Sequence, residues 1–481
     1  MANRTRNAFS QFHRFRPSAP CRQTRFSISH SHRSTAIRME PSRVKYQFVE
    51  EVERLDYYVP GGYHPVMIGD EFCAGRYVIA HKLGFGRSAT TWLAEDRRHS
   101  RLVALKISTA ESAGRTHEMQ ILSRLANAIS GLPRKAIVHV QNMLDSFMFS
   151  GPNGTHQCLV MDAARINIHE AKEAAYHRLL HLPAARAITS QLILGLQFIH
   201  SQHIVHGDLH LANILLRLPL DMQDMTLEQL HARTGEPAKE QVVREDGAPL
   251  DIGVPSEVIV PVWLGLSSDE ISLADSAITI ADFGEAFDPQ MTQQFTSHTP
   301  LLLAPPESRF AEPEESDEPL SFPGDIWTLA CTIWGIFGSG PPFEAFPVTL
   351  DEVTIEHVEM LGKLPDRWWN KWGKRSNWFD EDGCKNVKET LQQWYGNSAR
   401  GWTQRFTEYI QRPRERKRFD TFSAEEENAF CDMMKSMLVL EPSKRATIEE
   451  VVGCEWMQKW GLPAVQKMQD ATLAARPLDA R

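Results

Sequence analysis

Long apolar runs and patterned cysteines are both missing from this 481-residue chain. The best apolar run, Leu329–Phe337, is about half of the roughly 20 residues that span a bilayer, so we expect no membrane segment. The seven cysteines are scattered without any Cys-x-x-Cys, which argues against a disulfide framework or a zinc site. With 42% hydrophobic and 23% charged residues, the composition is typical of a globular protein.

Acidic residues are absent from the first 39 positions, which carry eight arginines. The formal net charge of −9 therefore leaves −17 for residues 40–481. An acidic body attracts basic partners at long range and repels nucleic acid, so we expect no direct binding to DNA or RNA. Simple solubility is the alternative explanation of this charge.

The basic arm, residues 1–45, has two interpretations. It is rich in arginine and serine, and Ala8, Phe9, Phe12 and Phe15 share one face of a helix, as in a mitochondrial transit peptide. The alternative is a disordered arm that precedes the first folded residue. The arm lacks the hydrophobic core of a secretory signal.

Regular patterning begins near Tyr46 and changes character along the chain. Alternating apolar residues predict strands first, and helical spacing predicts one helix among them at 117–128. Helices dominate from residue 184 onward, interrupted by a stretch with several prolines and glycines that we interpret as an insertion at 219–276. The predicted strands are 76–80, 91–94, 102–107, 157–161, 214–216 and 278–281, and the later helices are 184–201, 326–337, 350–361, 424–440 and 448–460.

A glycine-rich turn lies between the first two predicted strands. Gly84 and Gly86 let backbone N–H groups approach a polyphosphate without an intervening side chain. Ala89 occupies the third glycine position of the usual G-x-G-x-x-G pattern. The candidate phosphate-binding residues are Leu83, Gly84, Phe85, Gly86, Arg87, Ser88, Ala89, Thr90 and Thr91.

Lys106 ends the third predicted strand, about twenty residues after the glycine turn. A lysine among buried strand residues requires a partner, because an unpaired charge is costly to bury. Glu118, on the next helix, is the candidate partner. A lysine at the strand edge that faces water is the alternative.

Two further motifs supply oxygen-bearing side chains. In His206-Gly207-Asp208-Leu209-His210-Leu211-Ala212-Asn213, Asp208 can accept a proton from a hydroxyl and Asn213 can ligate Mg²⁺. Asp282, in Asp282-Phe283-Gly284, follows a second short strand and would be the second metal ligand. Both motifs come directly before or after a predicted strand.

Three shorter motifs follow in the helix-rich part. They are Pro305-Pro306-Glu307, Asp325-Ile326-Trp327 and Lys444-Arg445-Ala446-Thr447. We expect Glu307 and Arg445 to form a buried ion pair that braces this part of the chain, and breaking such a pair costs on the order of 3–5 kcal/mol.

The complete order of these motifs resembles the signature set of the protein kinases, from Tyr46 to Trp460. Within that superfamily the chain resembles the SR-protein kinases, which phosphorylate serines in the Arg-Ser repeats of splicing factors. Their pattern is matched by Gly61-Gly62-Tyr63-His64-Pro65-Val66-Met67-Ile68-Gly69-Asp70 and by the long break between Asn213 and Asp282.

The resemblance implies an α+β, bilobal protein-kinase-like fold. The N-lobe, 46–163, would hold an antiparallel sheet and one helix. The C-lobe, 164–463, would be mainly helical, with an insert at 217–276 and a tail at 464–481. The family is found in cytoplasm and nucleus, which is the expected location, with the mitochondrion as the alternative that the arm suggests.

The resemblance also implies the roles of the site residues. ATP would bind between the lobes with its adenine near Met161 and Ala163. Lys106, held by Glu118, would contact the phosphates, while Asn213 and Asp282 would hold Mg²⁺. Asp208 would orient the substrate serine. The expected substrates are basic Arg/Ser-rich proteins, which suit the acidic body, and the expected state is a monomer.

Departures from the pattern leave other functions open. His210 replaces the family's lysine two residues after Asp208, and Gly207 leaves no arginine to pair with an activation-loop phosphate. The same loop resembles that of aminoglycoside phosphotransferases, so a small-molecule phosphotransferase is one alternative. A non-catalytic scaffold is another, because His210, Ala89 and the long insert all depart from the common pattern.

Overall fold

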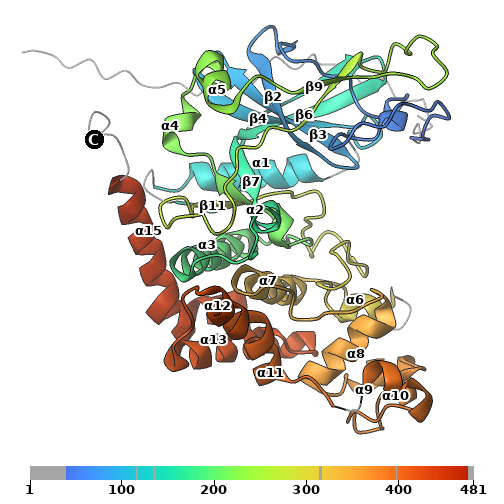
Figure 1. The fold of residues 1–481 in the computed structure, drawn as a ribbon, viewed down its shortest axis with the longest axis vertical. Helices are drawn as coiled ribbons and strands as arrows, with labels where there is room; N and C mark the ends of the chain where they lie inside the picture. Colours follow the sequence, from blue (N-terminus) through green and yellow to red (C-terminus); the bar gives the residue numbers. More distant parts are fainter. Residues whose placement is uncertain (1–38, 115–116, 134–136, 314–316, 397, 475–481) are drawn as a thin grey trace, which may run out of the picture.

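A computed structural model describes residues 39–114, 117–133, 137–313, 317–396 and 398–474, and Figure 1 shows them as a sheet-containing lobe stacked on a helical lobe. The predicted bilobal fold is confirmed. Most of the arm, residues 1–38, lies outside the described residues, so both of its interpretations stay predictions. Residues 39–45, assigned to the arm, already contact the folded body, because Ser42 N–H donates to the carbonyl of Asp56 at 2.7 Å.

The N-lobe is built on a six-stranded antiparallel sheet with the strand order β1-β2-β3-β4-β6-β5. Trp92, Leu105 and Val160 lie in its core, which confirms the predicted strands in this lobe. The fifth strand was not predicted, because most of its side chains are only partly buried and show no clear alternation. The strands are β1 (Glu71–Phe72), β2 (Tyr77–Phe85), β3 (Ala89–Asp96), β4 (Arg101–Ser108), β5 (Met143–Gly151) and β6 (Gly154–Asp162).

Helix α1 (Glu118–Ser130) lies under this sheet and joins it to the lower lobe (Figure 1). Its buried residues Ile121, Leu122 and Leu125 recur at helical spacing and pack into the large core that continues into the C-lobe. The helix begins with Glu118, whose side chain is buried. This placement brings a carboxylate from α1 toward β4.

The C-lobe is organised around α3 (Leu182–Ser201) and α7 (Phe322–Phe337), which pack against each other. Of the described helices, α3 is the one with the length and apolarity of a membrane span, but its side chains are largely buried inside the protein, as in a core helix. Further helices of this lobe are α2 (Ile168–Ala174), α6 (Glu307–Phe310), α8 (Leu350–Leu361), α9 (Asp366–Lys371), α10 (Gln392–Tyr395), α11 (Trp402–Phe406), α12 (Arg412–Lys417), α13 (Ala424–Met437) and α14 (Ile448–Gly453).

A small antiparallel sheet lies at the junction of the lobes. Its order is β11-β8-β7, with β7 at Ala164–Asn167, β8 at Ile214–Arg217 and β11 at Ile278–Ile280. The predicted short strands at 214–216 and 278–281 are therefore neighbours. Their pairing decides where the residues that precede β8 and follow β11 lie.

The insert has a defined structure and covers the N-lobe. It contains α4 (Leu220–Gln223), α5 (Leu227–Thr234), β9 (Lys239–Gln241) and β10 (Glu257–Ile259), which Figure 1 shows beside the N-lobe sheet. Val242 and Val258 of the insert pack with Leu55, Tyr58 and Tyr63 of the segment that precedes β1. Apolar side chains on both sides of this contact explain why the insert folds against the segment that precedes β1.

The end of the chain differs from the expected tail. Residues 464–474 continue α15 (Leu462–Ala474), whose Ala464, Val465 and Met468 pack against Ala187 of α3. The predicted helix at 448–460 is divided into α14 and a following π-helical turn at Met457–Gly461.

The predicted ion pair between Glu307 and Arg445 is confirmed. Two nitrogens of Arg445 meet the two carboxylate oxygens of Glu307 at 2.7 and 2.6 Å, and both side chains are buried. The guanidinium also lies 5.0 Å from the ring centre of Trp327. This bidentate pair joins α6 to the segment before α14.

Candidate active site

The glycine-rich turn is the connection from β2 to β3, and its backbone faces open space. Antiparallel pairing places Gly84 opposite Thr91. A Cβ added at Gly84 or Gly86 would meet no other atom within 4 Å. The carbonyl of Gly86 accepts a hydrogen bond of 2.8 Å from the hydroxyl of Tyr63, which holds the turn against the segment that precedes β1.

Lys106 of β4 joins both lobes. Its Nζ lies 2.7 Å from Oε1 of Glu118 and 3.0 Å from Oδ1 of Asp282, so the predicted pairing with Glu118 is confirmed. Burial alone would lower the pKa of Lys106, but the two carboxylates outweigh it and raise that pKa above its ordinary value. Lys106 holds the pKa of Asp282 at about 2, so the lysine is positive and the aspartate ionised at neutral pH.

Strand pairing brings Asn213 and Asp282 together, although 68 residues separate them in the sequence. Ile214 of β8 pairs with Ile280 of β11, so the residue before β8 and the residues after β11 lie at the same end of the small sheet. The N–H of Ala281 donates to the carbonyl of Asn213 at 2.9 Å. The side chains of Asn213 and Asp282 line the same cavity.

The loop that carries Asp208 is held from below by Asp325 of α7. The carboxylate of Asp325 accepts hydrogen bonds from the backbone N–H groups of His206 at 2.7 Å and Gly207 at 3.0 Å, and lies 2.9 Å from Nε2 of His200. Burial raises the pKa of Asp325, but these hydrogen bonds outweigh it, and the pKa lies below its usual value. A buried carboxylate with several donors fixes a loop firmly.

One carboxylate oxygen of Asp208 accepts no hydrogen bond from any described residue. Its Oδ1 is buried without a hydrogen-bond partner, while its Oδ2 lies 3.4 Å from Nε2 of His210. Asn213 Nδ2 donates to the carbonyl of Asp208 at 2.8 Å and therefore ties the two ends of the loop together. A buried, unpartnered carboxylate oxygen beside a cleft is suited to accept a hydrogen bond from a substrate hydroxyl.

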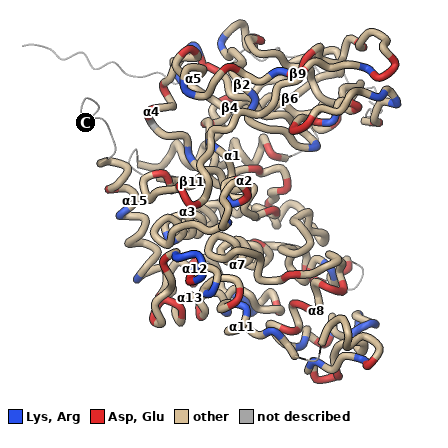
Figure 2. The backbone as a smooth tube through the Cα atoms, in the orientation of Figure 1, with Lys and Arg blue, Asp and Glu red and all other residues tan. Residues whose placement is uncertain are grey.

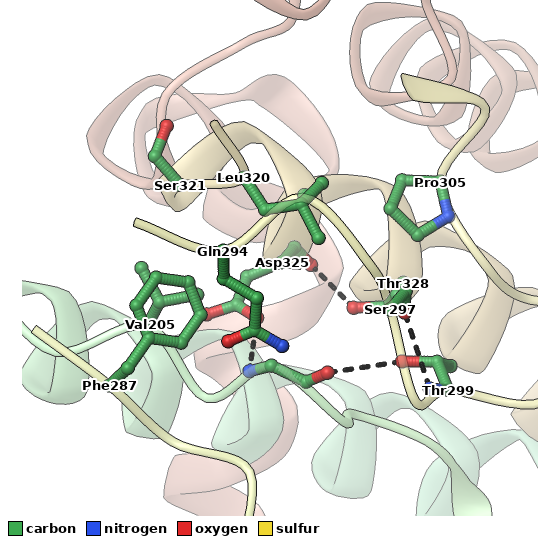
Figure 3. Close-up of a pocket in the computed structure, with 12 residues that line it drawn as sticks. Val205, Phe287, Gln294, Ser297, Thr299, Pro305, Leu320, Ser321, Asp325 and Thr328 are labelled. Atoms are coloured by element: carbon green, nitrogen blue, oxygen red, sulfur yellow. Dashed lines mark hydrogen bonds between the residues drawn. The ribbon is translucent and has the colours of Figure 1, made fainter. Parts of the chain in front are cut away.

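Gly207 directly contacts the segment that follows Asp282-Phe283-Gly284, residues 285–299. Its φ is +78°, and a Cβ there would lie 2.6 Å from the carbonyl oxygen of Glu285, so the close approach requires glycine. The hydroxyl of Thr299 donates to the carbonyl of Gly207 at 3.2 Å, beside a cavity of about 20 Å³ that Figure 3 shows with Asp325 on its other side. The hydroxyl of Thr299 and the close approach of Glu285 therefore attach this segment to the loop.

A cavity of about 300 Å³ lies between the lobes and receives most of the predicted site residues. Those that line it are Leu83, Gly84, Phe85, Gly86, Ser88, Ala89, Thr91, Lys106, Met161, Asn213 and Asp282. Glu118 lies behind Lys106, and Asp208 and His210 adjoin Asn213. The structure thus brings the phosphate-binding and metal candidates to one cleft and places the proton-accepting candidate Asp208 beside it.

Three predicted binding residues lie outside the cavity lining. Thr90 faces the opposite side of β3 because strand side chains alternate, and its hydroxyl accepts a hydrogen bond of 2.9 Å from Trp92. Ala163 lines a different hollow on the outside of the lobe junction. Arg87 is exposed at the tip of the turn, with its side chain outside the cleft.

Several lining residues were not predicted. Ala104 lies two residues before Lys106 on β4 and therefore on the same face of the strand. Strand alternation was a signal that could have found it. Gln141 comes from the segment before β5 and Arg165 from the short strand β7, and neither carries a motif. Val262 and Leu264 belong to the insert, where nothing in the sequence pattern indicated contact with the cleft.

Comparison with known proteins supports the protein-kinase resemblance that the motifs indicated. Residues 77–226 match the family model described as the protein kinase domain. The chain is 26% identical over 423 residues to the serine/threonine-protein kinase SRPK of Physarum polycephalum, which covers 84% of this chain and 90% of that protein.

Two other relatives are more similar over a shorter region. Protein kinase dsk1 of Schizosaccharomyces pombe is 36% identical over 173 residues, and human SRSF protein kinase 3 is 35% identical over 173 residues. Each alignment covers 35% of this chain and about three tenths of the relative. The kinase-domain match, these relatives and the arrangement of Lys106, Glu118 and Asp282 together identify the chain as an SRPK-like serine/threonine protein kinase.

Proposed function

We propose that this kinase transfers the γ-phosphate of ATP to serine in basic, Arg/Ser-rich proteins. The observation that carries the proposal is the position of Lys106 between Glu118 and Asp282, with Asn213 in the same cleft and Asp208 hydrogen-bonded to Asn213. The name of the human relative, SRSF protein kinase, supports a substrate of the splicing-factor class.

The charged residues of the site have different roles: the cation binds phosphate and a carboxylate accepts the proton. Lys106 is a fixed cation that donates to phosphate oxygens of ATP, and Glu118 prevents it from moving away from the cleft. The exposed backbone of the glycine turn covers the phosphates. Asp208 accepts the hydrogen of the serine hydroxyl and aims its oxygen at the phosphorus. Most of the rate enhancement then comes from positioning and charge neutralisation.

Asn213 and Asp282 are suited to hold Mg²⁺. The carboxylate of Asp282 is ionised and half exposed to the cleft, and Asn213 adds an amide oxygen. Mg²⁺ commonly keeps water and phosphate oxygens among its ligands, so two side-chain oxygens from the protein would be enough to hold it here. When bound, Mg²⁺ neutralises the charge that develops on the transferred group.

The net negative charge of residues 40–481 as a whole, rather than one acidic patch, would attract a basic substrate. Figure 2 shows acidic and basic residues interspersed over both lobes. Within the acidic run at 312–318, Asp317 lies 3.2 Å from Lys371 and accepts the N–H of Glu312 at 3.0 Å, so this acid serves the local fold. The net charge of −17 over residues 40–481 is the feature that favours arginine-rich peptides.

The test is transfer of radiolabelled phosphate from ATP to an Arg-Ser-repeat peptide, beside an acidic peptide of equal length. The parent should label the first peptide preferentially, and Asp208→Asn should lose about 10³-fold or more in kcat. The variant should still gain thermal stability from Mg-ATP, because Lys106 and Asp282 are unchanged. Equal labelling by Asp208→Asn, or turnover of aminoglycosides and simple alcohols with none of the peptides, would refute the proposal.

A further inference from the structure

The insert supplies part of the wall of the nucleotide cavity. Val262 and Leu264 line this cavity together with Leu83, Lys106 and Met161. The stretch 260–268, which we name the strap, is extended and has no regular strand or helix before its final turn. A kinase cleft would be built from the two lobes alone, so the role of the strap requires its own explanation.

Hydrogen bonds attach the strap to the N-lobe at one end. The N–H of Val262 donates to the carbonyl of Lys82 at 2.8 Å, directly before Leu83 and the glycine turn. The N–H of Val260 donates to the carbonyl of Ala238, which ties the strap to the rest of the insert. The strap is therefore bonded to β2 at the residue that precedes Leu83, which also lines the cavity.

The other end of the strap is attached to the lobe junction and the C-lobe. Arg165 of β7 donates from Nε to the carbonyl of Leu264 at 2.8 Å. Gly265 passes so close to β7 that an added Cβ would lie 2.3 Å from Cδ1 of Ile166. The N–H and the hydroxyl of Ser268 then donate to the carbonyls of Ala171 and Leu179, each at 2.8 Å.

The side chains of the strap alternate between the cavity and solvent. Leu264 is only 6% exposed and packs with Ala80, Leu93 and Leu102 of the N-lobe sheet, while the intervening Trp263 is 53% exposed. This alternation is that of an extended chain with one face against the protein. The apolar face is therefore directed toward the cavity and the sheet beside it.

We propose that the strap is the outer wall of the base end of the nucleotide site and determines nucleotide affinity and base specificity. Lys106 and Asp282 mark the phosphate end, so Val262 and Leu264, attached to Lys82 and Arg165, enclose the other end. Because the strap is bonded to both lobes, it also slows their separation and hence nucleotide release. This inference rests on the proposed use of ATP.

The experiment compares the full chain with Leu264→Ala, with Val262→Ala, and with the control Leu250→Ala, which shortens an insert leucine that packs with Val242 and Val254 away from the cavity. The readouts are KM for ATP, kcat at saturating ATP, and the dissociation rate of a fluorescent methylanthraniloyl-ADP. A thermal unfolding scan confirms that each variant is folded.

Loss of apolar contact at the base should raise KM for ATP about 10-fold in Leu264→Ala, with kcat within about twofold of the parent. The ADP analogue should leave faster by a similar factor, and the variant should accept ATP that carries a benzyl group on N6, which the parent should reject. Leu250→Ala should match the parent. Arg165→Gln should change the same quantities in the same direction, because it removes the anchor at the carbonyl of Leu264.

Parental KM, release rate and analogue rejection in Leu264→Ala and Val262→Ala would overturn the role of the strap while leaving the kinase assignment intact. A fall in kcat with unchanged KM and release would also overturn it, because a wall of the base site acts on binding. Failure of the parent to bind the ADP analogue would instead refute the proposed use of ATP, and with it this inference.

Discussion

At the scale of single residues, His210 is the departure from the kinase pattern that lies nearest the proposed proton acceptor. Its Nδ1 accepts the N–H of Ala212 at 3.2 Å, which directs Nε2 toward Oδ2 of Asp208. Nε2 also lies 3.3 Å from Nδ2 of Asn213. The imidazole thus occupies the gap between the two functional side chains, where it supports the loop and presents a polar ring atom to Asp208.

We expect His210→Ala to lower kcat by about 10²-fold, the scale for loss of one well-placed polar group in an active site, with a smaller change in KM for ATP. His210→Lys should keep kcat at or above the parental value, because lysine is the residue that the SR-protein kinases carry there. Steady-state kinetics of peptide phosphorylation measure both. Parental kcat in His210→Ala would show that the imidazole is not needed.

At the scale of elements, the segment that precedes β1 holds β2 and the glycine turn through a buried ion pair. Lys82 is 0% exposed and pairs with Glu53, which is 2% exposed and also accepts the hydroxyl of Tyr58. Nζ of Lys82 lies 5.4 Å from the ring centre of Trp92. Burial lowers the pKa of Lys82, and the carboxylate of Glu53 opposes that change without cancelling it.

We expect Glu53→Gln to lower the free energy of unfolding by about 3–5 kcal/mol, because it leaves the charge of Lys82 buried without its counter-ion. The double variant Glu53→Gln/Lys82→Met should recover most of that loss, since it removes the unpaired charge as well. Urea unfolding of the single and double variants measures the difference. A double variant as unstable as Glu53→Gln would mean that the ion pair is not the origin of the effect.

At the scale of the whole molecule, neutral histidines are buried in both lobes. Burial lowers the pKa of His64 and His81 to about 4, and that of His139 and His357 to about 3. In the unfolded chain a histidine has a pKa near 6.5. Below that pH the unfolded chain binds more protons than the folded protein, so stability decreases as pH falls from about 6.5 toward 4.

His357 gives the clearest test of this acid sensitivity. Its ring packs against Trp327 and Phe343, and burial, aided by the positive charges of Arg405, Arg445 and Arg309, lowers its pKa. We expect His357→Phe to reduce the stability lost between pH 6.5 and pH 4 by on the order of 3 kcal/mol. Urea unfolding at several pH values gives this difference, whatever the change at pH 7. Parallel pH curves for parent and variant would contradict the prediction.

Local sequence was sufficient to identify the candidate residues of the site. Within 206–213, and again within 282–284, the residues are close in the chain. Their spacing therefore already determines which oxygens each short loop can present. Strand alternation and helix spacing likewise predicted β2, β3, β4, β6 and most of the large helices, because burial of one face leaves a periodic pattern. The partnership of Lys106 with Glu118 followed from the cost of an unpaired buried charge.

Tertiary structure decided what depends on contacts between distant segments. The pairing of β8 with β11 brings Asp282 to Asn213 and Lys106, and the fold of the insert brings Leu264 to the cleft and Val262 to Lys82. The ion pair of Lys82 with Glu53 and the packing of α15 on α3 are of the same kind. Short-range periodicity reports only which face of an element is buried, whereas the partner of that face is chosen by packing across the whole chain.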